Sequence, residues 1–151
     1  MPGSGTRGTW IDETDIRPTL MYLTGLRDDY EHDGRVITQV LSHPNSALST
    51  PGVADLGACY KQLNSSVGEL GTDTLQAATK AIESTSPGDS VFVGTDQALR
   101  RLDIARDRLA LRIKGELEAA ASGNVPIRGV LPQIVGCRAI IAGVHALSSG
   151  S

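Results

Sequence analysis

Aromatic residues and cysteines are scarce in this 151-residue sequence. Only 3% of its residues are aromatic, so a core has to be built from Leu, Ile, Val and Ala, a composition that favours packed helices over a β-sandwich. The only two cysteines, Cys59 and Cys137, belong to no CxxC pair, and no zinc-binding motif is present. Their spacing does not decide between a disulfide and two thiols, and two buried thiols are the simpler expectation.

Long apolar runs are also missing. No run approaches the roughly 18 residues that cross a bilayer, so we expect no membrane span. The first residues lack the basic and apolar regions of a signal peptide. Residues 1–8 are therefore predicted to be a flexible leader rich in Gly and Ser, and the sequence leaves the compartment open.

Neither sign of charge is in large excess, because 14 Lys and Arg stand against 17 Asp and Glu. The net charge of −3 gives no general attraction to nucleic acid. With 40% hydrophobic and 21% charged residues, the composition is that of a folded domain. The densest basic run is interleaved with carboxylates, which predicts a solvated helix face with ion pairs; its cations are Arg100, Arg101, Arg106, Arg108, Arg112 and Lys114.

The N-terminal part carries the clearest helix signals. Thr14 or Asp15 can cap a helix, Pro18 suits its first turn, and Gly25 can end it. In the loop that follows, Gly34 is predicted to take a positive φ. The next stretch, VITQVL, fits either a short helix or a strand.

After residues 43–52, which are rich in Pro and Ser and predicted to be a linker, helical periodicity dominates residues 53–148. The sequence predicts a mainly α fold, a bundle of three to four antiparallel helices. Gly71 is expected to close the first helix, Thr72 to open the second, and the two glycines of the last, Gly136 and Gly143, to weaken it. The apolar positions expected to face inward are Val53, Leu56, Tyr60, Leu63, Val67 and Leu70, then Leu75, Ala78 and Ile82, then Leu99, Leu102, Ala105, Leu109, Ile113 and Leu117.

An acidic loop is the obvious place to look for chemistry; it contains Asp28, Asp29, Glu31, His32 and Asp33. Such residues could bind a divalent cation or transfer protons, but their spacing is not that of an EF-hand. A solvated structural loop is the simpler interpretation. His43 is expected to be exposed in the linker, and His145 to lie on the last apolar segment without a ligand role. No nucleophile motif or phosphate-binding loop is present; the glycine-bearing stretches GTRGTW, GELGTDT and SPGDSVFVG lack the required lysine.

One segment resembles a known family. TDIRPTLMYLTGL, residues 14–26, resembles the D-[IV]-x-P-T-[LM]-x-x-L-x-G segment that lies late in hydrolase domains of the alkaline phosphatase superfamily. The longer run from residue 9 to 41 is similar to the end of an actinobacterial phosphodiesterase or nucleotide-pyrophosphatase-like group in which a helical extension follows. Two later stretches resemble that extension, CYKQLNSSVGELGTDTLQAATKAIES and LDIARDRLALRIKGELEAAA.

The resemblance implies a phosphoester hydrolase with two divalent metals, expected to be zinc, held by Asp and His residues. In the family those ligands and the nucleophile lie upstream of the matched segment, so no catalytic, cofactor-binding or metal residue is assigned in this chain. Asp15, Pro18 and Thr19 match a supporting helix, with Asp15 as its cap. Residues 9–42 would be the C-terminal edge of the α/β domain. The chain is thus predicted to be a C-terminal fragment, inactive alone, from a truncated frame, a split gene or a designed cut.

A second hypothesis is a stand-alone helical protein-interaction module. It predicts exposed apolar surface around Ile16, Leu20, Leu23 and Val36, which would bind the missing catalytic domain or a second copy. A third is an enzyme of another type that uses Asp28, His32 and Asp33. The sequence leaves the substrate, the oligomeric state and the pairing of the cysteines open.

Overall fold

The computed structural model describes residues 10–27, 29–30, 32–85 and 87–150, and within these residues the chain forms helices and turns without a strand. The mainly α prediction is therefore confirmed. The predicted leader, residues 1–8, and two members of the acidic loop, Asp28 and Glu31, lie outside the described residues. The helices are α1 (Ile16–Thr24), α2 (Val53–Asn64), α3 (Glu69–Glu83), α4 (Ser90–Gly123) and α5 (Val130–Ser149), with 3-10 turns η1 (Glu13–Asp15), η2 (Thr38–Val40) and η3 (Pro87–Asp89).

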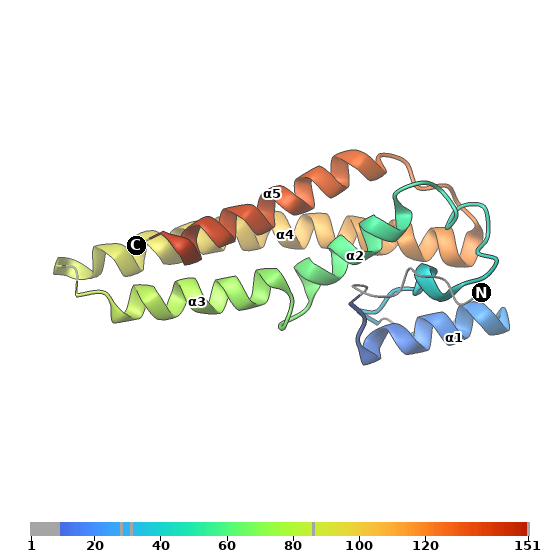
Figure 1. Ribbon diagram of the computed structural model, residues 1–151, viewed down its shortest axis with the longest axis horizontal. Helices are drawn as coiled ribbons and strands as arrows, with labels where there is room; N and C mark the ends of the chain where they lie inside the picture. Colours follow the sequence, from blue (N-terminus) through green and yellow to red (C-terminus); the bar gives the residue numbers. More distant parts are fainter. Residues whose placement is uncertain (1–9, 28, 31, 86, 151) are drawn as a thin grey trace.

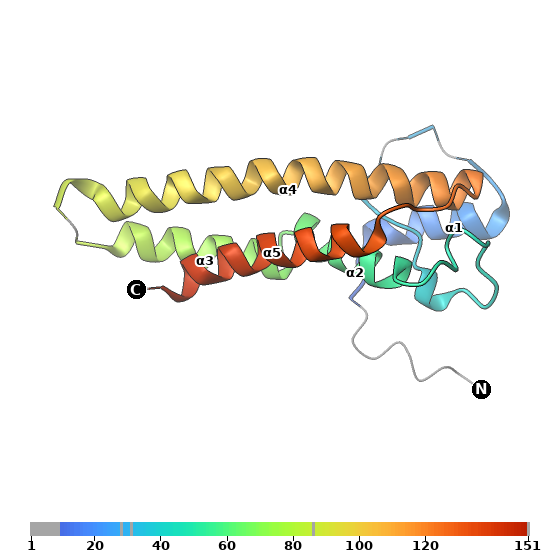
Figure 2. The same cartoon turned by 90° about the horizontal axis from the view of Figure 1, so that it is seen from above.

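The long helix α4 organises an elongated bundle (Figure 1). Helices α2 and α3 follow one another along α4, α5 runs beside them, and α1 lies at the end of the bundle where α4 ends (Figures 1 and 2). Because α3 and α5 both pack against α4 and against each other, the half of the bundle that contains α3 is a three-helix arrangement. The other half, where α4 ends, also contains α1 and the segment that follows it.

The break between α2 and α3 corrects the predicted helix boundary. Residues 53–70 were expected to form one helix that Gly71 would close, but α2 ends at Asn64 and α3 begins at Glu69, with Gly71 inside it. Both glycines lie where the chain folds back on itself: a Cβ on Gly68 would be 2.8 Å from the Gln62 carbonyl oxygen, and one on Gly71 would be 2.4 Å from the Ser66 carbonyl oxygen. Close backbone approach, and not a helix stop, therefore explains Gly71.

The predicted inward faces are correct for the residues of α2 and only in part for α3 and α4. Val67, expected to continue the first face, lies between α2 and α3 and is exposed. Leu75 and Ile82 of α3 are exposed, and the small residues Ala77 and Ala81 are buried instead. In α4, which begins earlier than expected, Ala105 is exposed. The apolar spacing alone could not choose among these faces, because α3 packs closely through its alanines.

Glycines let α5 approach α4 closely, a role that the sequence did not predict. A Cβ on Gly143 would lie 3.0 Å from Leu102 Cδ2, and one on Gly136 would lie 3.4 Å from Leu109 Cδ2. The two leucines are seven residues apart on α4 and the two glycines are seven residues apart on α5, so the two contacts are in register between the antiparallel helices.

Within the described residues, α5 is the one helix long and apolar enough to cross a membrane by length and composition, where none was expected.

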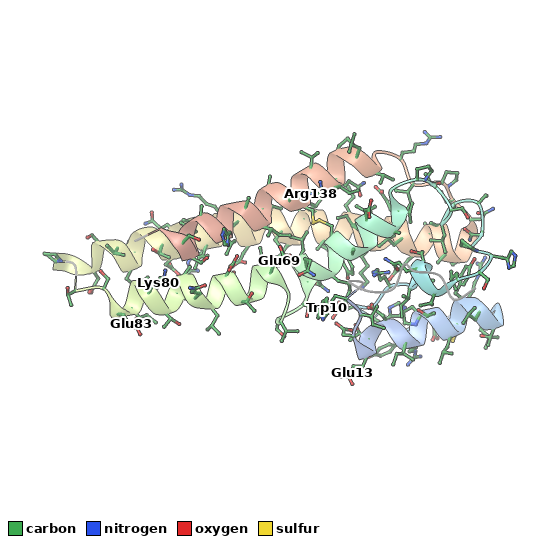
Figure 3. All side chains as sticks on the ribbon, in the orientation of Figure 1. Trp10, Glu13, Glu69, Lys80, Glu83 and Arg138 are labelled. Atoms are coloured by element: carbon green, nitrogen blue, oxygen red, sulfur yellow. A yellow bond between two sulfur atoms is a disulfide. The ribbon has the colours of Figure 1, made fainter. Side chains whose placement is uncertain are left out.

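A disulfide joins α2 to α5 between two clusters of buried residues. The structure links Cys59 to Cys137, so the expectation of two thiols is wrong; the bond is drawn in yellow in Figure 3. One cluster includes Leu56, Tyr60, Ile113 and Leu117, and Cys137 itself belongs to the other, with Leu63, Leu70, Ile140 and Val144. The bond therefore ties the last helix to the middle of the bundle.

The segment predicted as a linker, residues 43–52, packs against the end of α4. Ala47 and Leu48 are buried in the first cluster. The Asn45 side-chain amide donates to the Ala120 carbonyl oxygen at 2.8 Å, and Asn124 Oδ1 accepts from the Ala47 backbone N–H at 2.9 Å. The first bond satisfies a carbonyl at the C-terminal end of α4 that the helix itself leaves without a partner, and the second satisfies a backbone N–H of residues 43–52.

We expect reduction of the disulfide to lower the free energy of unfolding by about 2–4 kcal/mol, because it releases a long loop of the unfolded chain. Urea titrations with and without dithiothreitol measure the difference. The double variant Cys59→Ser/Cys137→Ser is the control and should not respond to the reductant. Equal midpoints for the oxidised and reduced wild-type chain would contradict the expectation.

Candidate functional site

The inner face of α1 clamps the extended segment 34–37. Asp15 Oδ1 accepts from the Arg35 backbone N–H at 2.9 Å, and Thr19 Oγ1 accepts from the Ile37 backbone N–H at 3.0 Å. Asp15 and Thr19 are buried and belong to the segment that carries the family resemblance. They satisfy two amides that in a sheet would bond to a neighbouring strand. This contact is called the α1 clamp below.

The spacing of the α1 clamp follows from elementary geometry. Four residues of α-helix rise about 6 Å, and two residues of extended chain span about 6.6 Å. Asp15 and Thr19 are four apart on one helix face, and Arg35 and Ile37 are two apart on the segment. The distance between the two acceptors on the helix therefore matches the distance between the two N–H groups on the segment. The stretch VITQVL is accordingly extended first and then forms the turn η2.

Gly34 is required for close contact, and its predicted positive φ is wrong. The described glycines with positive φ are Gly25, which ends α1 as predicted, Gly52 and Gly129. A Cβ on Gly34 would lie 1.8 Å from the Thr14 carbonyl oxygen. Any side chain there would force the segment away from the start of α1 and open the clamp.

A buried ion cluster holds the start of α1, and Asp15 is its centre. Asp15 is the N-cap residue of α1, as predicted, but its side chain makes no cap bond to that helix. It accepts instead from the Asp12 backbone N–H, while Asp12 caps η1 through Thr14. Lys61 of α2 is only 2% exposed, and its Nζ lies 2.8 Å from Asp12 Oδ2 and 3.3 Å from Asp15 Oδ1.

Lys61 is the key residue that the sequence analysis missed. Its Nζ also donates to Thr14 Oγ1 at 3.1 Å and lies 5.8 Å from the centre of the Trp10 ring. A fully buried ammonium is stable only when it is paired in this way. The one available signal was a lysine on the buried side of the α2 periodicity, next to Tyr60, and lysines at such positions usually extend to solvent.

Arg35 is a second buried cation, 3% exposed. Its Nη1 donates to the Val36 carbonyl oxygen and to Gln39 Oε1, both at 3.1 Å. Burial lowers the pKa of the guanidinium, and the charges of Asp15 and Asp12 act in the opposite direction. Nε and Nη2 have no hydrogen-bond partner within the described residues.

The acidic loop does not assemble a metal site in the part of the chain that the structure describes. His32 Nδ1 lies 3.2 Å from the Gly34 carbonyl oxygen, and the Asp33 carbonyl oxygen accepts from the Tyr60 hydroxyl at 3.0 Å. Burial, followed by the charge of Asp33, raises the pKa of that hydroxyl. No three His, Cys, Asp or Glu side chains of the described residues come together as a metal would require.

The structure also places His145 in an arrangement that the sequence did not predict. His145 Nδ1 lies 3.0 Å from Asp73 Oδ2 on α3, and Ser149 Oγ lies 3.3 Å from His145 Nε2. This order resembles a hydrolase triad, but the imidazole is 67% exposed. The group also lies at the C-terminal end of α5, where backbone carbonyls, and not N–H donors, surround any oxyanion. We assign it a structural role between α3 and α5.

Three further predictions concern the exposure of side chains. His43 is exposed, as expected. The basic run of α4 forms ion pairs along the helix, with Arg100 Nε 2.8 Å from Asp96 and Arg106 Nε 2.9 Å from Asp107. The prediction of a solvated face is wrong at the end of the run, where Lys114 is buried. On α1, Ile16, Leu20 and Leu23 are exposed as predicted, whereas Val36 is buried against Tyr60 and its neighbours. The predicted apolar patch is therefore correct on the helix and wrong at Val36, because the α1 clamp turns that side chain into the core.

Searches of family models, of curated proteins and of solved structures found no match to this chain.

The α1 clamp can be tested by replacing Thr19 with valine, which keeps the shape but leaves the Ile37 N–H without its acceptor. We expect the free energy of unfolding to fall by about 1–3 kcal/mol. Thr24→Val is the matched control, since Thr24 donates to a carbonyl one turn earlier in the same way but lies exposed; its effect should stay within about 0.5 kcal/mol. Equal losses in urea titrations would contradict the clamp.

The ion cluster predicts a specific loss of stability in acid. Burial raises the pKa of the Asp12 carboxyl, but hydrogen bonds from Lys61 and Thr14 outweigh it and hold the pKa below its ordinary value of 3.8. Folding thus favours the charged carboxylate. Its contribution to the free energy of unfolding is fully present above the ordinary pKa, and it is lost as the pH falls through the lower pKa of the folded state. Asp12→Asn should reduce the acid dependence of the unfolding midpoint between neutral pH and pH 3. Glu13→Gln, the neighbouring exposed acid, should leave it unchanged.

Proposed function

We propose that this chain is a helical extension of a phosphoester hydrolase of the alkaline phosphatase superfamily, and that the outer face of α1 binds the α/β domain of that enzyme. The chain would serve as scaffold and docking surface. The metal-dependent chemistry would belong to the α/β domain, which in this family binds two divalent metals. The described residues do not fit such a centre, so no catalytic step is assigned to them.

The exposed outer face of α1 carries the proposal. Ile16, Leu20 and Leu23 follow the i, i+4, i+7 spacing that places side chains on one face of a helix, and each is more than half exposed. A run of large apolar side chains on one face of a short helix is the usual mark of a surface that another protein covers. We call Ile16, Leu20 and Leu23 the α1 stripe.

The inner face of α1 supports the same proposal. Asp15 and Thr19 fix α1 to the rest of the chain, so the α1 stripe is presented on a rigid helix and loses little freedom when it is covered. Both residues lie in the segment that resembles the hydrolase family. In this proposal the resembling segment has two faces, one that anchors the helical unit and one that contacts the α/β domain.

The alternative function is a stand-alone helical interaction module. One observation favours it: three residues that precede α2 belong to the same cluster of buried side chains as residues of α2, α4 and α5. They are Val36, Ala47 and Leu48. Such a unit has a core of its own and could bind a protein partner, or a second copy, through the same α1 stripe.

Leu20→Asp tests the proposal. The partner is the α/β domain of a phosphodiesterase of this superfamily, produced without its own D-x-x-P-T segment, and binding is measured by titration calorimetry. We expect the wild-type chain to bind and the variant to bind at least about tenfold more weakly, because a charge replaces a buried contact. Leu75→Asp on α3, where Leu75 is 70% exposed compared with 55% for Leu20, is the matched control and should bind normally.

Two outcomes would count against the proposal. If the wild-type chain does not bind but dimerises in sedimentation experiments, and Leu20→Asp abolishes the dimer, the stand-alone module is favoured. If the purified chain hydrolyses bis(4-nitrophenyl) phosphate in the presence of Zn²⁺, the assignment of the chemistry to another domain is wrong.

A further inference from the structure

A pocket of about 230 Å³ lies between α1, α4 and the segment 32–36. Its floor belongs to the first cluster of buried residues, with Val36, Tyr60 and Leu117. Met21 and Leu26 line its more accessible side, and Leu26 is 62% exposed although its side chain is apolar. A molecule in the pocket would therefore extend the core and remove these side chains from water.

The walls of the pocket are fixed by bonds between parts of the chain that are distant in sequence. The Tyr22 hydroxyl accepts from the Asn45 backbone N–H at 2.7 Å, which holds the Tyr22 ring in place. Arg27 Nη2 donates to the Ser122 carbonyl oxygen at 3.1 Å and joins the residues after α1 to the end of α4. The pocket is therefore formed before any ligand enters, as sites for small molecules usually are.

Three polar side chains that line the pocket already bond to backbone carbonyl oxygens. Arg27 does so at the end of α4, as described above. His32 Nδ1 lies 3.2 Å from the Gly34 carbonyl oxygen, and the Tyr60 hydroxyl donates to the Asp33 carbonyl oxygen at 3.0 Å. None of the three depends on a ligand for its bond.

The charged groups around the pocket favour a ligand without charge. Arg35 cannot pair with a bound anion, because its Nε packs against Gly57 of α2 and both Nε and Nη2 are fully buried. Glu118 lines the pocket and is exposed to water, and its negative charge is opposed by two cations that also line the pocket, Arg27 and Lys114. Lys114 is buried and has an interaction of its own. An ion of either sign would therefore lose water without meeting a field of the opposite sign alone.

The volume of the pocket limits the size of a ligand. An apolar cavity of about 150 Å³ is large enough to hold benzene, and drug-sized ligands occupy pockets of about 300–1,000 Å³. We propose that this pocket, whose volume lies between these values, binds a small uncharged apolar molecule about the size of one substituted aromatic ring. The residues of the α1 stripe do not line the pocket, so this inference does not rest on the proposed function.

Toluene is the probe, and benzoate and benzylammonium, which carry a negative or a positive group on the same ring, are its controls. Binding to the ¹⁵N-labelled chain at neutral pH is followed by NMR. We expect toluene to shift the backbone signals of residues that line the pocket, and each ion to bind at least about tenfold more weakly, because its charge loses hydration there. The proposal is overturned if millimolar toluene shifts no signal at the pocket, or if either ion binds as tightly as toluene. Tight binding of benzylammonium alone would indicate an amine paired with Glu118.

Substitutions locate the site. Met21→Trp should fill the pocket from α1 and abolish the shifts caused by toluene, and Ala121→Trp should do the same from α4, since both residues line the pocket. Thr24→Trp is the matched control, because Thr24 is exposed on α1 and does not line the pocket; this variant should bind toluene as the wild-type chain does. Circular dichroism confirms that each variant is folded. Undiminished binding by a folded Met21→Trp or Ala121→Trp chain, or loss of binding in Thr24→Trp, would refute the assignment. If neither filled variant folds, the comparison of toluene with the two ions decides.

Discussion

The carboxylate of Asp15 is the group on which the N-terminal half depends. It is fully buried and receives the N–H of Arg35, the N–H of Asp12 and the ammonium of Lys61. These donors come from three separate parts of the chain. A buried charge is tolerated only when all of its partners are present. The positions of α1, the extended segment and α2 therefore depend on one another.

The same arrangement explains why one short helix can have two opposite roles. Its inner face is occupied by polar groups that bind backbone amides, with Pro18 and Thr19 buried. Its outer face carries the α1 stripe. A helix that were held only by apolar packing would be expected to turn its largest side chains inward; here the hydrogen bonds of Asp15 and Thr19 fix the rotation of α1, and the leucines remain outside. The anchoring groups and the α1 stripe, for which we propose a docking role, therefore lie on opposite faces of α1 and its N-cap residue, Asp15.

The rest of the bundle is held by close packing and by a covalent bond. Glycines on α5 allow leucines of α4 to approach, and the disulfide joins α5 to α2 between the two clusters of buried residues. This explains how a chain with few aromatic residues forms a closely packed bundle. Short distances between helices and a cross-link take the place of large ring contacts.

The amino-acid sequence by itself determined the helical class, the end of α1 at Gly25, the inward face of α2 and the ion-paired surface of α4, because these follow from periodicity, glycine conformation and charges four residues apart. It could not determine the pairing of Cys59 with Cys137, the role of Gly34, Gly71 and Gly143, or the burial of Lys61 and Arg35. Each of those depends on a neighbour that is distant in the chain, and local propensity carries no information about which backbone or side chain will approach. The clamp of Asp15 and Thr19 on Arg35 and Ile37 belongs to the same group. Its two spacings match only after tertiary structure has brought a helix and an extended segment together.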